Sequence, residues 1–480
     1  MQPQYIILLI VAYFSVLIFI SFITGKSADN KTFFKANNSS PWYLVAFGMI
    51  GASLSGVTFI SVPGWVEAQS MSYFQMVLGY VVGYAIIGLI LLPLYYKLNL
   101  TSIYTYLEDR FGRYSYKTGA SFFLLSRTIG AAFRLFLVAN VLQVILFDAY
   151  GIPFWVTVSI TILLIWLYTF KGGIKTIVWT DTLQTLFMLI AVGVCIYTIS
   201  DEMQIDSLFS YVSESKLSKI FFFDDVSAGN YFWKQFLSGA FIAVVMTGLD
   251  QDMMQKNLTC RNLKDAQKNM FWFTIVLVIV NFFFLALGVL LTDYAQKNGI
   301  DAHKDQLFPL IATQGNLGLA TALFFLLGLI AAAYSSADSA LTSLTTSFSI
   351  DILEIDKKED KKRQEKIRKK IHIVFSIVLV LIILIFKYFI ADESVIANIF
   401  KAAGYTYGPL LGLYAFGLFT KVNVKDKMVP FICLLAPVLT FIISYHSLQF
   451  FNFDFGFFVL ILNGFLTFIG LSLFKRKVNG

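Results

Sequence analysis

The chain has 480 residues, of which 58% are hydrophobic, 17% aromatic and only 14% charged. Its mean hydropathy of +0.73 lies far outside the range of soluble domains and is typical of an all-α polytopic membrane protein. The net charge of +8 does not indicate nucleic-acid binding, because the basic residues lie in short segments between apolar runs. The three cysteines are widely separated and suggest no disulfide or metal framework.

Apolar runs of about 20 residues, long enough to cross a bilayer, recur along the chain. They predict about 13 membrane-spanning helices, at residues 4–24, 42–66, 72–96, 115–146, 153–170, 178–200, 232–250, 271–293, 317–350, 372–390, 396–419, 428–446 and 453–474. The first run lacks a cleavage pattern and is interpreted as a retained span. About three quarters of the 37 basic residues then fall on one side. This predicts a multi-pass protein of the cell inner membrane, with its N-terminus outside and its C-terminus cytoplasmic.

Two inner segments are interpreted further. Residues 99–113 are predicted to form an amphipathic helix at the inner surface. Residues 256–268 are counted as a basic inner loop.

Two predicted spans contain residues that weaken a helix at membrane depth. In the second span these are Gly48, Gly51, Gly56, Pro63 and Gly64, interleaved with Ser53, Ser55 and Thr58. In the seventh span they are Ser238, Gly239, Thr247 and Gly248. Irregular backbone in a membrane is tolerated only where it lines a cavity or a ligand. Because five spans separate the two starting points, matched broken helices of inverted repeats are predicted, which is typical of a transporter binding site. Two glycine-rich packing helices are the alternative.

Residues 331–339 place small and hydroxyl side chains on one helical face of the ninth span. Ala332, Ser335, Ser336 and Ser339 stand at i, i+3, i+4 and i+7, and Asp338 lies one step off that face. A carboxylate at membrane depth is costly and marks a candidate functional site. Hydroxyl and carbonyl oxygens are the ligands that a small hard cation prefers. Close helix packing, with the hydroxyls bonded to the preceding turn, is the alternative.

Four stretches together resemble the sodium:solute symporter family. They are residues 51–61 (GASLSGVTFIS), 172–181 (GGIKTIVWTD), 248–256 (GLDQDMMQK) and 331–339 (AAAYSSADS). The resemblance covers nearly the whole chain and implies a LeuT-like fold in a single transmembrane transporter domain. The implied parts are a leading span and loop (1–41), a first five-span inverted repeat (42–200), an outer loop (201–231), a second repeat (232–419) and two trailing spans (420–480).

The resemblance implies that a sodium ion is the coupling ion and assigns its ligands. Backbone carbonyls of the first broken helix, with one carbonyl and two hydroxyls of the ninth span, would hold it at Gly51, Leu54, Ala332, Ser335 and Ser336. A second sodium, present in some family members, would use Asp181, Ser335, Asp338 and Ser339. Asp338 departs from the family pattern, which often has a hydroxyl there, and could strengthen cation binding or carry a proton. A helix N-cap is the alternative for Asp181.

The resemblance also places a solute between the two broken helices. Its candidate contacts are Ser53, Ser55, Thr58, Gln75, Arg134, Lys401 and Asp250. Arg134 lies near the middle of the fourth span, and with Lys401 it indicates an anionic solute gripped through a carboxylate. Related sialic acid transporters have an arginine at the matching place. Alternatively, Arg134 or Lys401 neutralises Asp250 or Asp338, or Lys401 extends to the outer interface.

We therefore expect a sodium-coupled secondary active symporter that imports a small organic solute by alternating access. An anionic solute, sialic acid or another carboxylate or sugar acid, is favoured. A sodium/neutral sugar or amino-acid symporter, or a transporter-like sensor without net transport, is the alternative. An enzyme is not expected, because the three histidines are scattered. The expected partners are the solute and the lipid bilayer, with no nucleic acid and no obligate protein partner.

Overall fold

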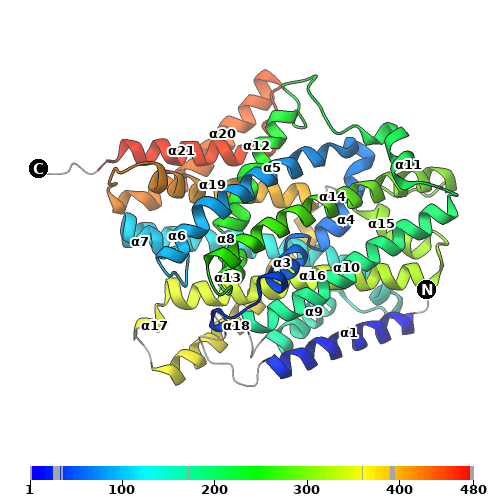
Figure 1. Cartoon of the computed structure of the whole chain (residues 1–480), viewed down its shortest axis with the longest axis horizontal. Helices are drawn as coiled ribbons and strands as arrows, with labels where there is room; N and C mark the ends of the chain where they lie inside the picture. Colours follow the sequence, from blue (N-terminus) through cyan, green and yellow to red (C-terminus); the bar gives the residue numbers. More distant parts are fainter. Residues whose placement is uncertain are drawn as a thin grey trace, which may run out of the picture.

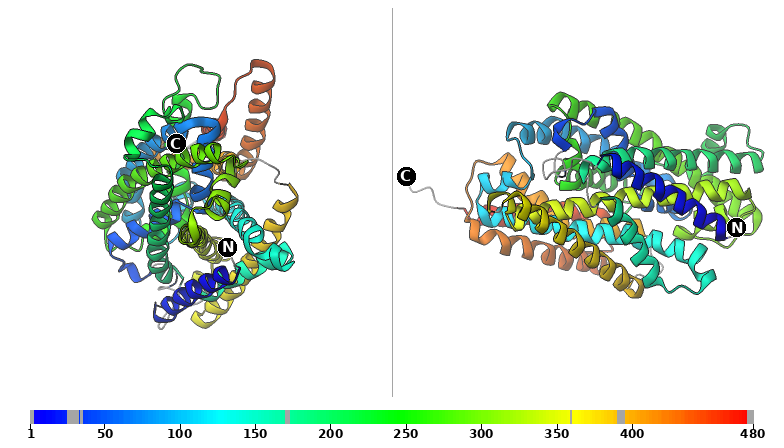
Figure 2. Two further views of the ribbon diagram at one scale, coloured as in Figure 1. Left: turned by 90° about the vertical axis from the view of Figure 1, so that its right-hand side faces the viewer. Right: turned by 90° about the horizontal axis from the view of Figure 1, so that it is seen from below.

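The computed structural model describes residues 3–24, 33, 36–169, 173–358, 360–389 and 395–475. Within these ranges the chain is almost entirely helical, and the only strand-like pairings are two isolated bridges, Ser40 with Cys260 and Val424 with Lys475. Most helices run along the long axis of the molecule, with α1 on one flank and α21 on the opposite flank (Figure 1). Viewed along that axis, α1 lies at the periphery of the bundle (Figure 2).

The α-helices of the first half are α1 (Pro3–Thr24), α3 (Trp42–Ser53), α4 (Gly56–Gln69), α5 (Tyr73–Ile86), α6 (Leu92–Lys97), α7 (Thr105–Arg110), α8 (Arg113–Leu142), α9 (Phe154–Thr169), α10 (Ile174–Glu202) and α11 (Leu208–Glu214). Those of the second half are α12 (Phe232–Ala243), α13 (Gln251–Asn257), α14 (Leu263–Asn298), α15 (Leu307–Gln314), α16 (Gly318–Ser347), α17 (Ile355–Lys358), α18 (Lys361–Phe389), α19 (Val395–Phe419), α20 (Val429–Phe451) and α21 (Val459–Leu473).

Nine helices among the described residues are long and apolar enough to cross a membrane, and the bent pair Phe232–Gly248 and Gln251–Asn257 would make a tenth. Every range predicted as a span contains helix. The count of thirteen spans stays a prediction, because some of these helices are short and others are joined. Gly56–Lys97, for example, is one apolar stretch of 42 residues, with a kink at Ser70, whose φ is +51°.

The first predicted helix break is confirmed. α3 ends at Ser53 and α4 begins at Gly56, and the two residues between them leave helical geometry. Leu54 has φ −83° and ψ 72°, and Ser55 is extended, with φ −68° and ψ 173°. Such a break leaves carbonyl groups of the last turn of α3 without partners in their own helix.

The second predicted break is also confirmed. α12 continues into a π-helical turn, Val244–Gly248, after which the chain bends by 69° into α13. Asp250 caps α13, since its carboxylate accepts hydrogen bonds from the backbone N–H groups of Asp252 at 2.9 Å and Met253 at 3.3 Å. The bend therefore has a defined structure rather than frayed ends.

α16 is enclosed by the helices that carry the candidate site. All of its residues from 328 to 347 are buried, and it packs against α10, α8 and the broken pair α3 and α4. Small residues allow this approach, because a Cβ atom on Gly56 would lie 3.4 Å from the Cα atom of Ala333. A Cβ atom on Gly51 would lie only 2.2 Å from the Oγ1 atom of Thr185 on α10. These glycines set the distance between α3, α4 and their neighbours.

Two sequence interpretations are wrong. Residues 99–113 do not form an amphipathic surface helix. Within this range only Thr105–Arg110 forms an α-helix of its own, and Arg113 begins α8. Tyr104 is fully buried, and its hydroxyl donates to the carbonyl of Leu249 at 2.9 Å. Lys256 is not in a solvated loop, since it lies on α13 with a side chain only 2% exposed. Residue 172, in one of the stretches that carry the family resemblance, lies outside the described residues.

Candidate functional site

The last turn of α3 meets the middle of α16. The hydroxyl of Ser336 lies 3.5 Å from the carbonyl oxygen of Ala52 and 3.4 Å from that of Ala332. Both distances exceed the usual range of about 2.5–3.0 Å for an O–H···O hydrogen bond. This fully buried hydroxyl therefore has no strong hydrogen bond among the described residues. The contact to Ala52 joins the break of α3 directly to α16.

This junction has the chemistry of a sodium site. The five residues predicted as ligands lie on the two segments that meet here: Gly51 and Leu54 at the end of α3, and Ala332, Ser335 and Ser336 in the middle of α16. Carbonyl groups at the C-terminal end of a broken helix carry partial negative charge, and with hydroxyl oxygens they solvate a hard cation without a buried carboxylate. The weakly bonded Ser336 hydroxyl is consistent with a ligand position. The donor set thus fits the ion.

Next to this junction, three helices contribute a buried charged cluster. Asp181 on α10 accepts a hydrogen bond from the hydroxyl of Ser335 at 2.7 Å. Its second carboxylate oxygen lies 2.7 Å from the ammonium nitrogen of Lys256 on α13. Asp338 accepts from the hydroxyl of Tyr168 at 2.8 Å, whereas the buried Ser339 hydroxyl has no hydrogen-bond partner among the described residues. Asp181 is therefore joined to both α16 and α13.

A cavity of about 70 Å³ opens beside the α3–α4 break. Its polar lining includes Ser53, Ser55 and Thr58 from the break, Tyr73, Tyr80 and Tyr84 from α5, Arg127 and Arg134 from α8, and Asn281 from α14. The four predicted contacts Ser53, Ser55, Thr58 and Arg134 are thus brought together in one place. A second, smaller cavity of about 10 Å³, also lined by both arginines, reaches Tyr407.

The two arginines of the cavity differ in their partners. Arg127 forms an ion pair with Asp252, and its guanidinium also lies 4.0 Å from a carboxylate oxygen of Asp250. Arg134 is 8% exposed, and no ion pair to it is seen among the described residues. The Nε and Nη1 atoms of Arg134 are buried without a hydrogen-bond partner there. Planar N–H donors of this kind match a carboxylate.

Three predicted solute contacts are not brought to the cavity. The amide of Gln75 donates to the carbonyl of Asn230 at 3.0 Å and accepts from the N–H of Phe222 at 3.0 Å, so it holds the segment that precedes α12. Lys401 is exposed on α19. Asp250 caps α13 and accepts from the hydroxyl of Tyr407 at 2.5 Å. The family resemblance placed them near the solute, but in the folded chain Gln75 and Asp250 bond to other groups and Lys401 is exposed.

Sequence reasoning missed the tyrosines of α5. Tyr73, Tyr80 and Tyr84 line the cavity, and the hydroxyls of Tyr73 and Tyr80 are 3.0 Å apart. Their spacing of i, i+7 and i+11 puts them on one helical face, and this signal was available in the sequence. An aromatic face on a spanning helix is common, however, and only the folded chain shows that this face points to a cavity.

Closures flank the cavity on two sides. Arg127 on α8 pairs with Asp252 on α13. The segment before α7 is bonded to the second break, because the hydroxyl of Tyr104 donates to the carbonyl of Leu249 and the N–H of Ile103 donates to the side-chain oxygen of Gln251 at 3.0 Å. We call these contacts the α13 latch. On another side, the cavity residues Tyr73 and Phe400 stack with ring centroids 6.4 Å apart. Phe457 packs edge-on against Phe400 at 5.1 Å. The structure is thus closed by polar bonds on one side and by aromatic rings on another.

Comparison with known proteins agrees with this arrangement. Residues 33–430 match the sodium:solute symporter family. A sodium/sialic acid symporter of Aliivibrio fischeri is 26% identical over 475 residues, which cover 95% of this chain and 90% of that protein. A second, from Proteus mirabilis, is 25% identical over 434 residues and covers 86% and 84%. The solved structure of a substrate-bound, outward-open Na⁺-coupled sialic acid symporter has a TM-score of 0.81 at 20% identity, with 100% of both chains covered, which shows the same LeuT-like fold. This chain belongs to the sodium:solute symporter family and is a sodium-coupled membrane symporter, not an enzyme.

Proposed function

We propose that the solute is a small organic anion whose carboxylate binds Arg134. The observation that carries this proposal is the buried guanidinium with two unpartnered donor nitrogens beside the cavity. A buried charge without a partner is costly. A cavity with a buried guanidinium that pairs with no carboxylate of the described residues is therefore suited to binding an anion. The sialic acid symporters to which the chain is similar transport such a solute. Sialic acid and other sugar acids or carboxylates are therefore the leading candidates.

The hydroxyl groups around the cavity suit the remainder of such a solute. Ser53 and Ser55 belong to the α3–α4 break, and Tyr80 and Tyr84 face them from α5. These groups can donate and accept hydrogen bonds, which a polyol or sugar ring would use. An apolar cavity of about 150 Å³ holds benzene, so the cavity of about 70 Å³ must widen to admit a sugar acid. The structure therefore shows a closed conformation of the protein.

Sodium binding and solute binding share the same broken helix. We propose that sodium is held by the carbonyls of Gly51, Leu54 and Ala332 and by the hydroxyls of Ser335 and Ser336. Ser53 and Ser55 are the two chain neighbours of Leu54, and both line the cavity. An ion that fixes the break also fixes these hydroxyls, so each ligand favours binding of the other by the same factor. This shared segment is the physical basis of coupling.

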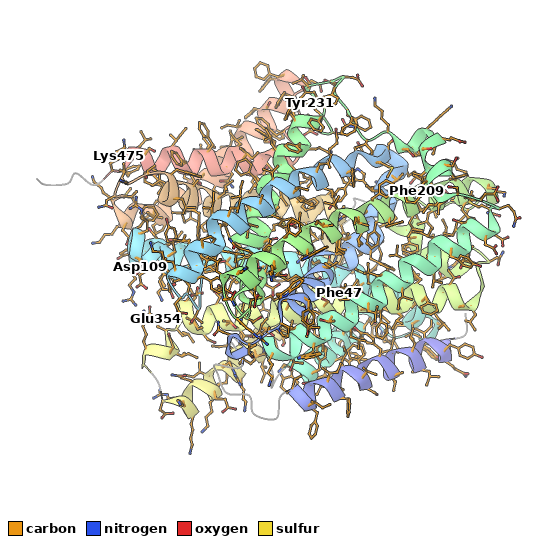
Figure 3. All side chains as sticks on the ribbon, in the orientation of Figure 1. Phe47, Asp109, Phe209, Tyr231, Glu354 and Lys475 are labelled. Carbon is orange, nitrogen blue, oxygen red and sulfur yellow. The ribbon has the colours of Figure 1, made fainter. Side chains whose placement is uncertain are left out.

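The proposed orientation follows the positive-inside rule. Asp109, Glu354 and Lys475 lie toward the same end of the bundle, and Phe209 lies toward the other (Figure 3). The basic segment 97–117 and the described residues of the basic segment 357–370 belong to the first of these ends. We assign this end to the cytoplasm, with the C-terminus inside and the N-terminus outside. The α13 latch then closes the cytoplasmic path, and Tyr73 with Phe400 covers the outer path.

The test is uptake into proteoliposomes under an inward sodium gradient, with labelled sialic acid, a small monocarboxylate and a neutral sugar as separate solutes. We expect sodium-stimulated uptake of an acid. Arg134→Lys should weaken its binding at least tenfold, because an ammonium cannot form the paired N–H contacts of a guanidinium. Arg363→Lys, an exposed arginine on α18, is the matched control and should behave as wild type. Uptake restricted to the neutral sugar, or unchanged in Arg134→Lys, would refute the anion assignment.

A further inference from the structure

Lys256 is a buried ammonium in the cluster predicted to hold a second sodium ion. Its side chain is 2% exposed, and its Nζ atom lies 2.7 Å from the Oδ2 atom of Asp181, which is fully buried. The other oxygen of Asp181 accepts the Ser335 hydroxyl at 2.7 Å. Both carboxylate oxygens of the central predicted ligand are thus already engaged by groups of the protein.

The remaining predicted ligands do not form an independent site. The Oδ2 atom of Asp338 accepts from Tyr168 at 2.8 Å, and its Oδ1 atom accepts from the backbone N–H of Ser339 at 2.5 Å. Among the predicted ligand atoms of the described residues, the Ser339 hydroxyl and the Oδ2 atom of Asp181 accept or donate no hydrogen bond of good geometry, and that Oδ2 atom is instead neutralised by the Lys256 ammonium as an ion pair. A sodium ion bound at Asp181 would have to share one carboxylate with an ammonium in a region of low dielectric, where like charges repel strongly.

An ammonium and a sodium ion satisfy this carboxylate in different ways. Both are compact single positive charges, and either can neutralise a buried aspartate. The ammonium of Lys256, however, is covalently tethered to α13, so it cannot be released on the opposite side of the membrane. It can therefore pair α13 with α10 without any ion being taken up or released, whereas a transported ion would join them only while bound.

We infer that the Lys256 ammonium is the resident cation of this cluster, so that the second sodium ion is not bound and one sodium ion is coupled to each solute. This inference rests on the proposed function for the site at Ser336, which supplies the single coupled ion. It also identifies Lys256 as a positioning residue that holds the segment after the second break against the helix bearing Asp181.

The test counts bound sodium directly, without a solute. Purified full-length protein is equilibrated with ²²Na⁺ in a choline buffer that contains no unlabelled sodium, and the number of ions bound per chain is measured. We expect one ion for the wild type and one more for Lys256→Met, which removes the ammonium but keeps a flexible chain of similar length. Lys256→Arg should bind the same number as the wild type. Lys268→Met, an exposed lysine on α14, is the matched control and should also bind the wild-type number.

The comparison between variants decides the inference. Two ions bound to the wild type, or no additional ion in a folded Lys256→Met, would overturn it. Lys256→Gln is purified in parallel as a second readout. Sodium should raise its melting temperature by more than it raises that of the wild type. Adding Ser336→Ala to Lys256→Met should remove the first ion and leave the new one. If the wild type binds no sodium but Lys256→Met binds one, the proposed site at Ser336 fails while the role of Lys256 stands.

Discussion

At the residue scale, three of the buried basic side chains differ in what neutralises them. Arg127 is paired with Asp252, and Lys256 with Asp181. Arg134 has no such partner among the described residues, and two of its donor nitrogens are unsatisfied. Because a buried charge must be paired to be tolerated, the first two are explained by the protein itself. The third is explained best by a ligand, which is why Arg134 carries the proposed function.

A pH-dependent contact is predicted at His303, in the loop before α15. Its Nδ1 atom lies 2.5 Å from a carboxylate oxygen of Glu67, and its Nε2 atom lies 3.0 Å from one of Asp301. The hydrogen bond and charge of Glu67 raise the pKa of His303 above its ordinary value of 6.5. The protonated ring therefore stabilises the folded loop. This contribution is fully present below about pH 6.5 and is lost as the pH rises through the higher folded-state pKa.

The measurement is an NMR titration of protein labelled with ¹³C-histidine, in which His303→Asn identifies the signal. We expect His303 to titrate above 6.5 and to return toward this value in Glu67→Gln. A His303 signal that titrates at or below 6.5 in the wild type, or one unaffected by Glu67→Gln, would show that this contact does not form in solution.

At the element scale, the contact between the end of α3 and the middle of α16 is the proposed sodium site. Ser336→Ala removes one hydroxyl ligand and leaves the helix intact. Loss of even an outer partner of a bound metal costs about 10–100-fold in affinity, so a direct ligand should cost at least tenfold. The sodium concentration for half-maximal thermal stabilisation should rise by this factor. Ser343→Ala is the matched control, because that buried hydroxyl bonds to its own helix, at the carbonyl of Ala340. Equal sodium affinity in both variants would contradict the site.

At the scale of the whole molecule, transport requires the cavity to open at alternate ends. The α13 latch opposes opening on the proposed cytoplasmic side. Asp252→Asn keeps the shape of the side chain but removes its charge, so Arg127 keeps only the longer contact to Asp250. We expect the population open to the cytoplasm to increase about tenfold for each 1.4 kcal/mol of latch energy lost.

Labelling of a cysteine in the cavity measures this shift. The cysteine is introduced as Met246→Cys, because Met246 lines the cavity. The three native cysteines are buried, so background labelling should be low. A membrane-impermeant thiol reagent applied to inside-out vesicles should react faster when Asp252→Asn is added. Asp109→Asn, an exposed carboxylate at the same end of the bundle (Figure 3), should not change the rate. Faster labelling from the opposite side instead would reverse the assigned orientation.

The sequence by itself was sufficient for features that depend on local residue pattern. Glycine and serine around residue 54 weaken a helix wherever it lies, so the α3–α4 break was predictable. The face formed by Ser335, Ser336 and Ser339 follows from helical periodicity. Arg134 stood out because charge is rare inside a membrane span. The family resemblance, carried by four short stretches, was confirmed by the match over residues 33–430.

Only the tertiary structure decided which side chains meet. Lys256 was counted with a basic loop, yet it lies beside Asp181, 75 positions earlier in the chain. Gln75, Lys401 and Asp250 had suitable chemistry, but Gln75 and Asp250 bond to other groups and Lys401 is exposed. The physical reason is that a helical pattern defines which residues share a face but not what that face contacts. Pairing and burial arise between helices far apart in sequence, so the composition of the cavity became evident only once the helices were packed.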